Sequence, residues 1–275
     1  MPTTLYGWPN NYYERDIMSK PIRRILVTND DGVDAPGLKI AAKIAAALSD
    51  DVWIVAPAEE QSGASHSLSL SHPVHLIKRG AKRYAVRGTP TDCVMIATRH
   101  LLKDDLPTLI LSGVNFGQNA AEDVSYSGTV AGAKEGTVFG IPSVALSQAI
   151  GFRDNKRTIN FGVAEKHGPK VIKKLMSVKW PAGTLMNVNF PDIATADKCD
   201  IVVTKQGKRD RSVLQLEERE DPRGVPYFWY TFDRKLQTPP IGTDIEALYA
   251  GNISVTALKM DHTDIAMQRK LGELF

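Results

Sequence analysis

The sequence predicts an α/β fold built on a mostly parallel β-sheet. Three consecutive segments carry this prediction: an aliphatic, β-branched run at residues 24–28, apolar residues at helical spacing over residues 36–50, and a second apolar run at residues 51–57. A strand, a helix and a strand in this order are typical of a βαβ unit with parallel strands and a right-handed crossover. Helices on both faces of such a sheet would complete a Rossmann-like three-layer sandwich.

The same alternation continues along the chain. Residues 68–88 alternate and turn at KRGAKR, which predicts a β-hairpin. Residues 91–102 predict a helix that Thr91 is placed to cap. Further elements are expected in this order: strand 106–115, helix 127–140, strand 141–147, helix 159–176, strands 184–191 and 200–207, helix 244–250 and strand 252–258. The helix at 127–140 is rich in small residues, which indicates close packing or backbone approach to a ligand.

Two segments differ from this pattern. Residues 1–17 are polar and aromatic, and we expect them to lie outside a single domain that spans residues 18–275. Within that domain, residues 209–243 are charged, then aromatic, then rich in proline, which predicts an extended hairpin or arm. A lone hairpin is marginal in water, and it cannot bury its aromatic side chains by folding on itself. We therefore expect this arm to form an interface in an oligomer.

Composition narrows the class of protein. The chain has 275 residues, a net charge of +3 and no long basic block, which argues against nucleic acid as an obligatory partner. No apolar run is long enough to span a bilayer, and the N-terminus lacks the layout of a signal peptide. The two cysteines, Cys93 and Cys199, form no CxxC pair and fit a reducing compartment, so we expect a cytoplasmic protein.

Side chains with oxygen atoms follow three of the predicted strands. Ligands of open α/β sheets bind beyond the carboxyl ends of the strands, so these loops are where a site is expected. Their candidate side chains are Asp30, Asp31, Ser62, Ser65, Asn115 and Asn119. Two carboxylates with neutral oxygens suit a hard cation, and Mg²⁺ or Mn²⁺ fits better than Zn²⁺. Alternatively, one aspartate caps the next helix and the other is solvated.

The segment YSGTVAG is a candidate anion site. Ser127, Gly128 and Thr129 would place hydroxyl groups and backbone N–H groups at a helix N-terminus, where phosphate binds well. The alternative is an ordinary helix capped by Ser127 or Thr129. The chain contains neither GxGxxG nor GxxxxGK[ST], so neither a Rossmann dinucleotide site nor a P-loop is indicated.

Five segments occur in the order of one known family. They are ILVTNDDGVDAPG, VAPAEEQSGASHSLSL, VRGTPTDCV, LILSGVNFGQN and DVSYSGTVAGAKEG. From about residue 18 to its end, the chain resembles the family of the stationary-phase survival protein SurE, which are metal-dependent 5′-nucleotidases. The resemblance implies one divalent metal ion per subunit, Mg²⁺ or Mn²⁺, held by Asp30, Asp31, Ser62 and Asn115.

The resemblance also implies how substrate and subunits are arranged. Phosphate contacts would come from Asn119, Ser127, Gly128 and Thr129. The GTPTDC turn at residues 88–93 would lie near the nucleotide, and the chain would form a homodimer or homotetramer with exchanged C-terminal arms. The expected reaction is hydrolysis of a nucleoside 5′-monophosphate by metal-activated water, with Asp30 or Asp31 as the proton acceptor. The nearest enzymatic alternative is a broader acid phosphatase or exopolyphosphatase.

Two other classes fit the strand-end aspartates less well. A phosphoaspartyl hydrolase of the haloacid dehalogenase type has a DxD pair, whereas Asp30 and Asp31 are adjacent, so their side chains diverge. A non-enzymatic, receiver-like metal-binding module needs a phosphoacceptor aspartate after the third strand, where this chain has Asn115. The nucleotidase is therefore the predicted function.

Overall fold

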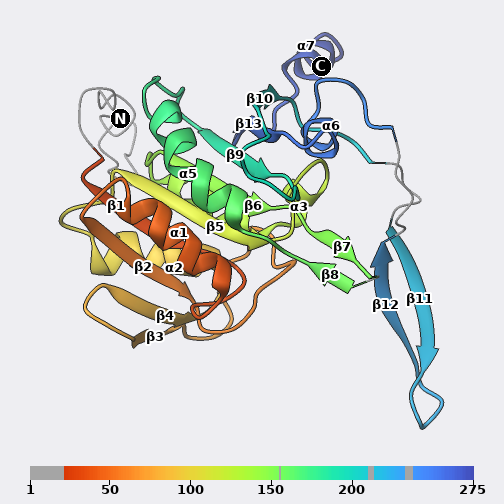
Figure 1. The fold of residues 1–275 in the computed structure, drawn as a ribbon, viewed down its shortest axis with the longest axis horizontal. Coiled ribbons are helices and arrows are strands. Elements are labelled where there is room, and N and C mark those ends of the chain that lie inside the picture. The colour runs from red at the N-terminus through yellow and green to blue at the C-terminus, as the bar shows by residue number, and fades with distance from the viewer. Residues whose placement is uncertain (1–21, 155, 210–213, 233–237) are drawn as a thin grey trace.

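One large β-sheet organises the fold in the computed structural model of the chain (Figure 1). The structure describes residues 22–154, 156–209, 214–232 and 238–275, so the predicted extension at residues 1–17 lies outside the described residues. Within the described residues the sheet has nine strands. Their order across the sheet is β10 (Ile201–Thr204), β13 (Ile253–Lys259), β9 (Thr184–Phe190), β6 (Ser143–Gln148), β5 (Leu109–Phe116), β1 (Arg24–Thr28), β2 (Asp51–Pro57), β4 (Arg83–Arg87) and β3 (His75–Lys78).

The sheet is mostly parallel, as predicted. The neighbouring strands from β9 through β6, β5, β1 and β2 to β4 all run in one direction. Strand β3 returns antiparallel to β4 in the predicted hairpin, and β13 lies antiparallel to β9 with β10 running alongside it. The loops that follow β1, β2 and β5 therefore meet at one edge of the sheet, the carboxyl edge.

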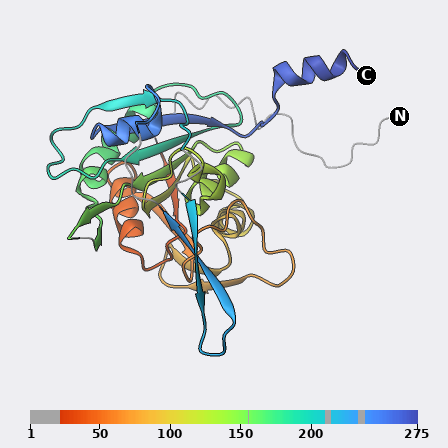
Figure 2. The same cartoon turned by 90° about the vertical axis from the view of Figure 1, so that its right-hand side faces the viewer.

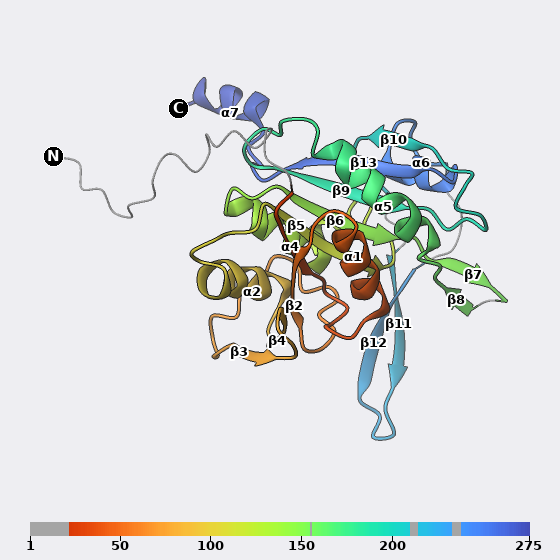
Figure 3. The same cartoon turned by 60° about the vertical axis from the view of Figure 1, so that its left-hand side comes forward.

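Helices cover both faces of the sheet (Figure 3). One face carries α1 (Pro36–Ala46) and α5 (Gly162–Leu175); the other carries α2 (Pro90–Ile96), a π-helical turn at Ala97–Leu101, and α4 (Gly128–Val138). Alternate residues of β1 serve the two layers, because Ile25 and Val27 pack with α1 while Leu26 packs with α2. The result is the predicted three-layer α/β sandwich.

The cap of α2 differs from the prediction. The sequence analysis assigned it to Thr91, but Thr89 is the capping residue. Its hydroxyl accepts a hydrogen bond from the backbone N–H of Asp92 at 3.2 Å, and the Asp92 carboxylate accepts one from the N–H of Thr89 at 2.8 Å. This reciprocal pair satisfies the N–H groups of Thr89 and Asp92, and Pro90 at the first helical position has no N–H group to satisfy.

Helix α4 packs closely against the sheet through a stripe of glycines. Gly128, Gly132 and Gly136 are spaced four residues apart, so they lie on one face of the helix. A Cβ added to Gly132 would lie 2.7 Å from Ser112 Oγ on β5, and one added to Gly136 would lie 2.3 Å from Ser143 Oγ on β6. The small residues noted in the sequence therefore bring the start of α4 against the carboxyl edge of the sheet.

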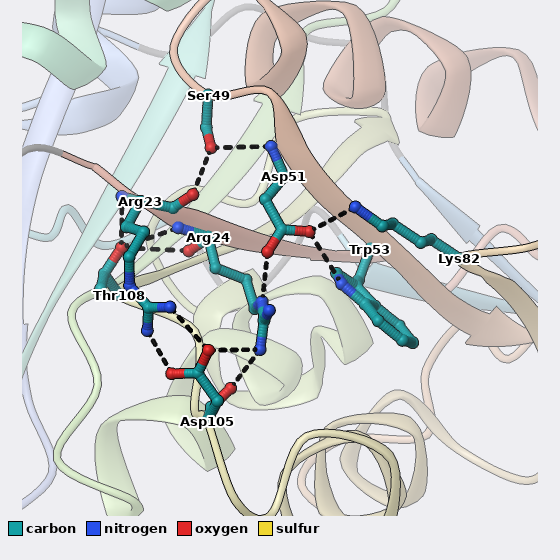
Figure 4. A network of polar contacts seen from close by, with 8 residues as sticks. All are labelled: Arg23, Arg24, Ser49, Asp51, Trp53, Lys82, Asp105 and Thr108. Carbon is teal, nitrogen blue, oxygen red and sulfur yellow. Dashed lines mark hydrogen bonds and ion pairs between the residues drawn. The ribbon is translucent and has the colours of Figure 1, made fainter.

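The amino ends of β1 and β2 are joined by a polar network (Figure 4). Arg24 donates from Nε to Asp51 Oδ2 at 2.6 Å, and Lys82 Nζ donates to Asp51 Oδ1 at 2.7 Å. Arg24 also pairs with Asp105, which forms a second ion pair with Arg23. This end of the sheet, the amino edge, thus holds its carboxylates between cationic side chains.

Several short elements lie outside the three layers (Figures 1 and 2). They are the hairpins β7–β8 (Gly151–Arg153, Lys156–Thr158) and β11–β12 (Leu214–Glu220, Pro226–Phe232), and the helices α3 (Asp123–Tyr126), α6 (Asp244–Tyr249) and α7 (Ile265–Gly272). The β11–β12 hairpin projects from the body and is the extended arm predicted at residues 209–243. Helices α3 and α7 and the β7–β8 hairpin were not predicted.

Among the described residues, no helix combines the length and apolar character needed to cross a membrane.

Candidate active site

The aspartate pair lies at the carboxyl edge, directly after β1. Asp30 is almost fully buried, and its Oδ1 accepts a hydrogen bond of 2.5 Å from the hydroxyl of Thr129 on α4. Burial raises the pKa of Asp30, and the hydrogen bonds from Thr129 only partly offset this effect. The carboxylate therefore carries its charge at an energetic cost in the absence of a cation.

Asp31 shares this environment. Its Oδ2 accepts a hydrogen bond of 3.1 Å from the backbone N–H of Phe116 at the end of β5. Burial, with the adjacent charge of Asp30, raises the pKa of Asp31 to about 7. No Lys, Arg or His of the described residues forms an ion pair with either carboxylate. A bound divalent cation would supply the missing positive charge.

The loop after β2 lies against the aspartate turn. The backbone N–H of Gln61 donates to the carbonyl oxygen of Asp30 at 2.8 Å, which places Ser62 next to the pair. Ser62 is exposed, and its hydroxyl donates to Glu60 Oε1 at 2.9 Å. The hydroxyl proton is thus directed to Glu60, and the oxygen lone pairs remain for a ligand. Glu60 also adds to the negative field at both aspartates, a role that the sequence analysis missed.

Asn115 comes from the end of β5. The register of β5 with β6 shifts between Ser112 and Asn115, and such an irregularity re-aims the side chains that follow it. The Asn115 amide donates from Nδ2 to the carbonyl oxygen of Gly117 at 2.8 Å, which leaves the amide oxygen as the group for a cation. The next residue, Phe116, is the one that contacts Asp31. The four predicted metal ligands thus come from the loop after β1, the loop after β2 and the end of β5.

The start of α4 abuts Asp30. Ser127 is the N-cap, and its hydroxyl accepts from the backbone N–H of Val130 at 3.0 Å. A Cβ added to Gly128 would lie 2.7 Å from the Cβ of Asp30, so only glycine permits this approach. Thr129 is fully buried with its hydroxyl on Asp30. The predicted anion site and the predicted metal site are therefore adjacent, and Thr129 serves the aspartate, a contact that the sequence analysis missed.

Asn119, the remaining predicted phosphate contact, is held from β6 and β9. Its Nδ2 donates to Ser147 Oγ at 2.9 Å, and its backbone N–H donates to Asn189 Oδ1 at 2.8 Å. Its carbonyl oxygen accepts from the amide of Asn187 at 2.8 Å. Asn187 and Asn189 were also missed, although two asparagines at alternate positions of an apolar strand share one face and could have signalled this role.

An open pocket of about 770 Å³ lies beside the loop that carries Ser62. Glu59 and Gln61 of that loop line it, as do Gly88 and Thr89 of the GTPTDC turn. The other lining residues are Ala58, Ser67, Leu68, Ser69, Ser71, His72, Pro73, His75, Val86 and Arg87. The pocket thus joins the predicted metal loop to the turn that the resemblance placed near a nucleotide.

The donor set of the aspartate pair fits a hard cation. Among the described residues, no three His, Cys, Asp or Glu side chains gather into a metal site. Neutral oxygens are the other ligands that a hard cation takes from a protein. Ser62 and Asn115 bring such oxygens to the same edge. Carboxylate, hydroxyl and amide oxygens are ligands that suit Mg²⁺ or Mn²⁺ better than Zn²⁺.

Comparison with known proteins identifies the family. A family model described as survival protein SurE matches residues 25–213. A protein named 5′-nucleotidase SurE from Azorhizobium caulinodans is 57% identical over 254 residues, covering 92% of this chain and 98% of the relative. A second protein of that name, from Parvibaculum lavamentivorans, is 55% identical over 250 residues, covering 91% of this chain and 90% of the relative.

Solved structures show the same fold. The crystal structure of the SurE protein from Aquifex aeolicus superimposes with a TM-score of 0.79 at 35% identity, covering 91% of this chain and 99% of that one. Together with the family model, this likeness shows that the chain belongs to the SurE family.

Proposed function

We propose that this chain is a 5′-nucleotidase that hydrolyses nucleoside 5′-monophosphates to nucleoside and phosphate. The observation that carries the proposal is the aspartate pair, which has no cationic partner among the described residues. Asp30 is almost fully buried against the N-terminus of α4, and Asp31 is partly buried beside it. A cation beside a helix N-terminus suits a phosphomonoester, whose negative charge both would attract. The relatives named 5′-nucleotidase SurE support the substrate class.

In this proposal one divalent cation, Mg²⁺ or Mn²⁺, is held by Asp30, Asp31, Ser62 and Asn115. When bound, such a cation lowers the pKa of a water ligand and neutralises charge on the phosphoryl oxygens. Asp31 is the better placed proton acceptor for the attacking water. Asp30 is almost fully buried with one carboxylate oxygen on Thr129, whereas Asp31 is more accessible and makes a single backbone hydrogen bond.

The phosphate would lie at the start of α4. Ser127 accepts the hydrogen bond of Val130 and keeps its own hydroxyl proton to donate to a phosphate oxygen. Gly128 would approach the phosphate through its backbone, and Asn119 would contribute its side-chain amide. Thr129, a predicted phosphate contact, would act on the phosphate mainly through Asp30. The nucleoside would occupy the pocket beyond Gln61, near Gly88 and Thr89.

The test is a panel of phosphomonoesters with and without metal. We expect hydrolysis of 5′-AMP and other nucleoside 5′-monophosphates to vanish with EDTA and to return on addition of Mn²⁺ or Mg²⁺. Residual metal is checked by elemental analysis. Full activity in a verified metal-free sample would contradict the proposed mechanism. Faster release of phosphate from polyphosphate or from simple aryl phosphates would favour the broader phosphatase.

We further propose a homodimer or homotetramer assembled through the β11–β12 hairpin. Among the described side chains, those of Leu216, Tyr227, Phe228, Trp229 and Tyr230 on the two strands of this hairpin are large, apolar and exposed. The hairpin projects from the body (Figure 1), and the other described residues leave these side chains exposed. Such a patch is typical of a protein–protein interface. The two free cysteines fit the reducing environment of the cytoplasm, where we place the protein.

Light scattering tests the assembly. We expect a mass of two or four chains at micromolar concentration, and a smaller mass for Trp229→Glu, because a charge at the centre of an apolar interface is costly to desolvate. Val178→Glu is the matched control, since Val178 is equally exposed on the body of the protein. A wild-type mass equal to one chain would refute the proposal. A Trp229→Glu variant that keeps the wild-type mass would place the interface elsewhere.

A further inference from the structure

We infer that Arg209 and Asp244 are positioning residues for the phosphate-binding turn, which we define as residues 119–127. This inference rests on the proposed function, because that function places substrate phosphate at Asn119 and Ser127. Neither Arg209 nor Asp244 belongs to the aspartate site or to α4. Both come from the C-terminal part of the chain, at the base of the arm that carries β11–β12. Their contacts fix the backbone of the turn between the two phosphate residues.

Arg209 binds the turn through its guanidinium group. It forms a two-pronged ion pair with Asp123, in which Nη2 lies 2.7 Å from Oδ2, and Nη1 also donates to the carbonyl oxygen of Ala120 at 3.1 Å. The backbone N–H of Arg209 donates to the Glu122 carboxylate at 3.0 Å. The Arg209 side chain is only 19% exposed, so this pair is shielded from solvent more than most surface ion pairs.

Asp244 holds the adjacent residue of the turn. It is fully buried, and its Oδ2 accepts from the backbone N–H of Ala121 at 2.9 Å while its Oδ1 accepts from the N–H of Gly207 at 2.8 Å. The carbonyl oxygen of Ala121 accepts from Gln206 Nε2 at 2.9 Å. Ala121 has a φ of 54°, a left-handed conformation that is unfavourable for alanine. These bonds supply the energy that keeps Ala121 in this conformation.

The geometry connects these contacts to the phosphate residues at both ends. Asn119 directly precedes Ala120, whose carbonyl oxygen accepts a hydrogen bond from Arg209. At the other end, the carbonyl oxygen of Asp123 accepts from the backbone N–H of Ser127 at 2.9 Å, so the ion pair that holds Asp123 also sets the position of the N-cap of α4. Displacement of a phosphate donor by about 1 Å is enough to cost a large part of its effect.

The two chain segments at the base of the arm meet at this point. The N–H of Lys205 donates to the carbonyl oxygen of Gly242 at 3.0 Å, and the N–H of Asp244 donates to that of Lys205 at 3.0 Å. Residues 205–209 and 242–244 thus form one unit, the arm base, although the arm separates them in sequence. The turn also packs against the residue that follows the arm base, because Ala120 and Ala121 are in apolar contact with Ile245.

The test measures phosphate binding separately from metal binding. We expect Arg209→Gln to raise both the inhibition constant of inorganic phosphate and the KM for 5′-AMP by about tenfold, with Mn²⁺ affinity unchanged. Asp123→Asn should have the same effect. The double variant should lose no more than either single variant, because both changes remove one shared interaction. Arg209→Lys keeps the charge without the two-pronged geometry and should recover part of the loss.

Arg219→Gln is the matched control. Arg219 belongs to the same arm and pairs with Glu217, but the pair is about half exposed and far along β11 from the turn. It should leave phosphate inhibition and KM unchanged. The inference is overturned if Arg209→Gln behaves like Arg219→Gln, or if it only lowers the melting temperature. If the wild-type protein neither hydrolyses 5′-AMP nor binds phosphate, the proposed function itself has failed, which is a different result.

Discussion

The two edges of the central sheet treat their carboxylates in opposite ways. At the amino edge, Asp105 is hydrogen-bonded to Arg23, which lowers its pKa. Burial alone would raise the pKa of Asp51 there, but Lys82 and Arg24 reverse the effect, and the pKa is lowered. At the carboxyl edge, burial raises the pKa of Asp30 and that of Asp31. The ionised form of aspartate is thus stabilised at the amino edge and destabilised at the carboxyl edge.

This difference in pKa separates carboxylates that stabilise the fold from carboxylates that are available to a ligand. Cationic side chains at the amino edge complete the local charge balance within the chain. Asp51 links β1 to β2, and Asp105 ties the start of β1 to the segment that precedes β5. At the carboxyl edge the fold supplies backbone N–H groups and one threonine hydroxyl, which orient the two carboxylates without neutralising them. Two adjacent charges, one almost fully buried and one partly buried, cost stability in this state, and a bound cation would recover it. The cost is localised where ligands of such sheets bind.

The largest effect is expected for Asp31→Asn at the carboxyl edge. The change keeps the shape of the side chain and removes one charge from the proposed metal site. We expect kcat/KM for 5′-AMP to fall by at least about a hundredfold, with weaker Mn²⁺ binding, because several kcal/mol of charge stabilisation depend on the cation. Turnover and a metal titration measure the two effects.

The metal-free protein gives this variant a second readout. The folded pKa of Asp31, about 7, lies above the ordinary aspartate value, so its contribution to stability is present at low pH and is lost as pH rises toward 7. In EDTA at pH 8, Asp31→Asn should therefore melt at a higher temperature than the wild type. The gap should close toward pH 4. A variant that melts lower than the wild type at pH 8 would contradict a destabilising role.

Asp51→Asn at the amino edge is the matched control. Its folded pKa is lowered, so its contribution to stability is present above the ordinary aspartate pKa and is lost as pH falls below it. We expect a loss of about 1–2 kcal/mol in the free energy of unfolding at neutral pH and little change in kcat/KM. Should both variants lose activity alike, the contrast between the two edges would not describe function.

Most of the fold follows from periodicity in the sequence. The apolar runs of β1, β2, β5 and β6 and the amphipathic stripe of α1 are local signals, so the parallel sheet and its layers could be predicted. The ends of elements were less certain, as the cap of α2 shows. Thr89 rather than Thr91 caps the helix, because only Thr89 has an acidic residue, Asp92, three positions later to complete the reciprocal pair. Helix α7 is short and exposed, and so left little signal.

The candidate site was predictable only in part. Strand-end loops gathered at one edge follow from topology, so Asp30 and Asp31 could be expected near Ser127. The individual hydrogen bonds could not, because they join residues far apart in sequence: Thr129 with Asp30, and Arg209 with Asp123. A glycine stripe indicates close packing, yet it does not say which side chain lies beneath it. Only the structure places Asp30 under Gly128.

A smaller effect is expected for Thr129→Val, which keeps the shape of the side chain and deletes its hydroxyl. In the structure that hydroxyl donates to Asp30, so the variant should bind Mn²⁺ about tenfold more weakly, as is typical when a group that orients a metal ligand is lost. Phosphate inhibition measured at saturating Mn²⁺ should change little. The sequence alone predicts the reverse, namely weaker phosphate inhibition with metal affinity intact.

Thr137→Val separates these outcomes from a general loss of stability. Thr137 is also buried on α4, but its hydroxyl donates to the carbonyl oxygen of Ala133 and not to a carboxylate. Both variants should lose a similar amount of stability, and only Thr129→Val should lose metal affinity. Weaker phosphate inhibition in Thr129→Val with unchanged metal affinity would instead make Thr129 a direct phosphate contact. If metal affinity and phosphate inhibition are the same in both variants, Thr129 is a packing residue only. The hydrogen bond from α4 to Asp30 would then contribute nothing to metal binding.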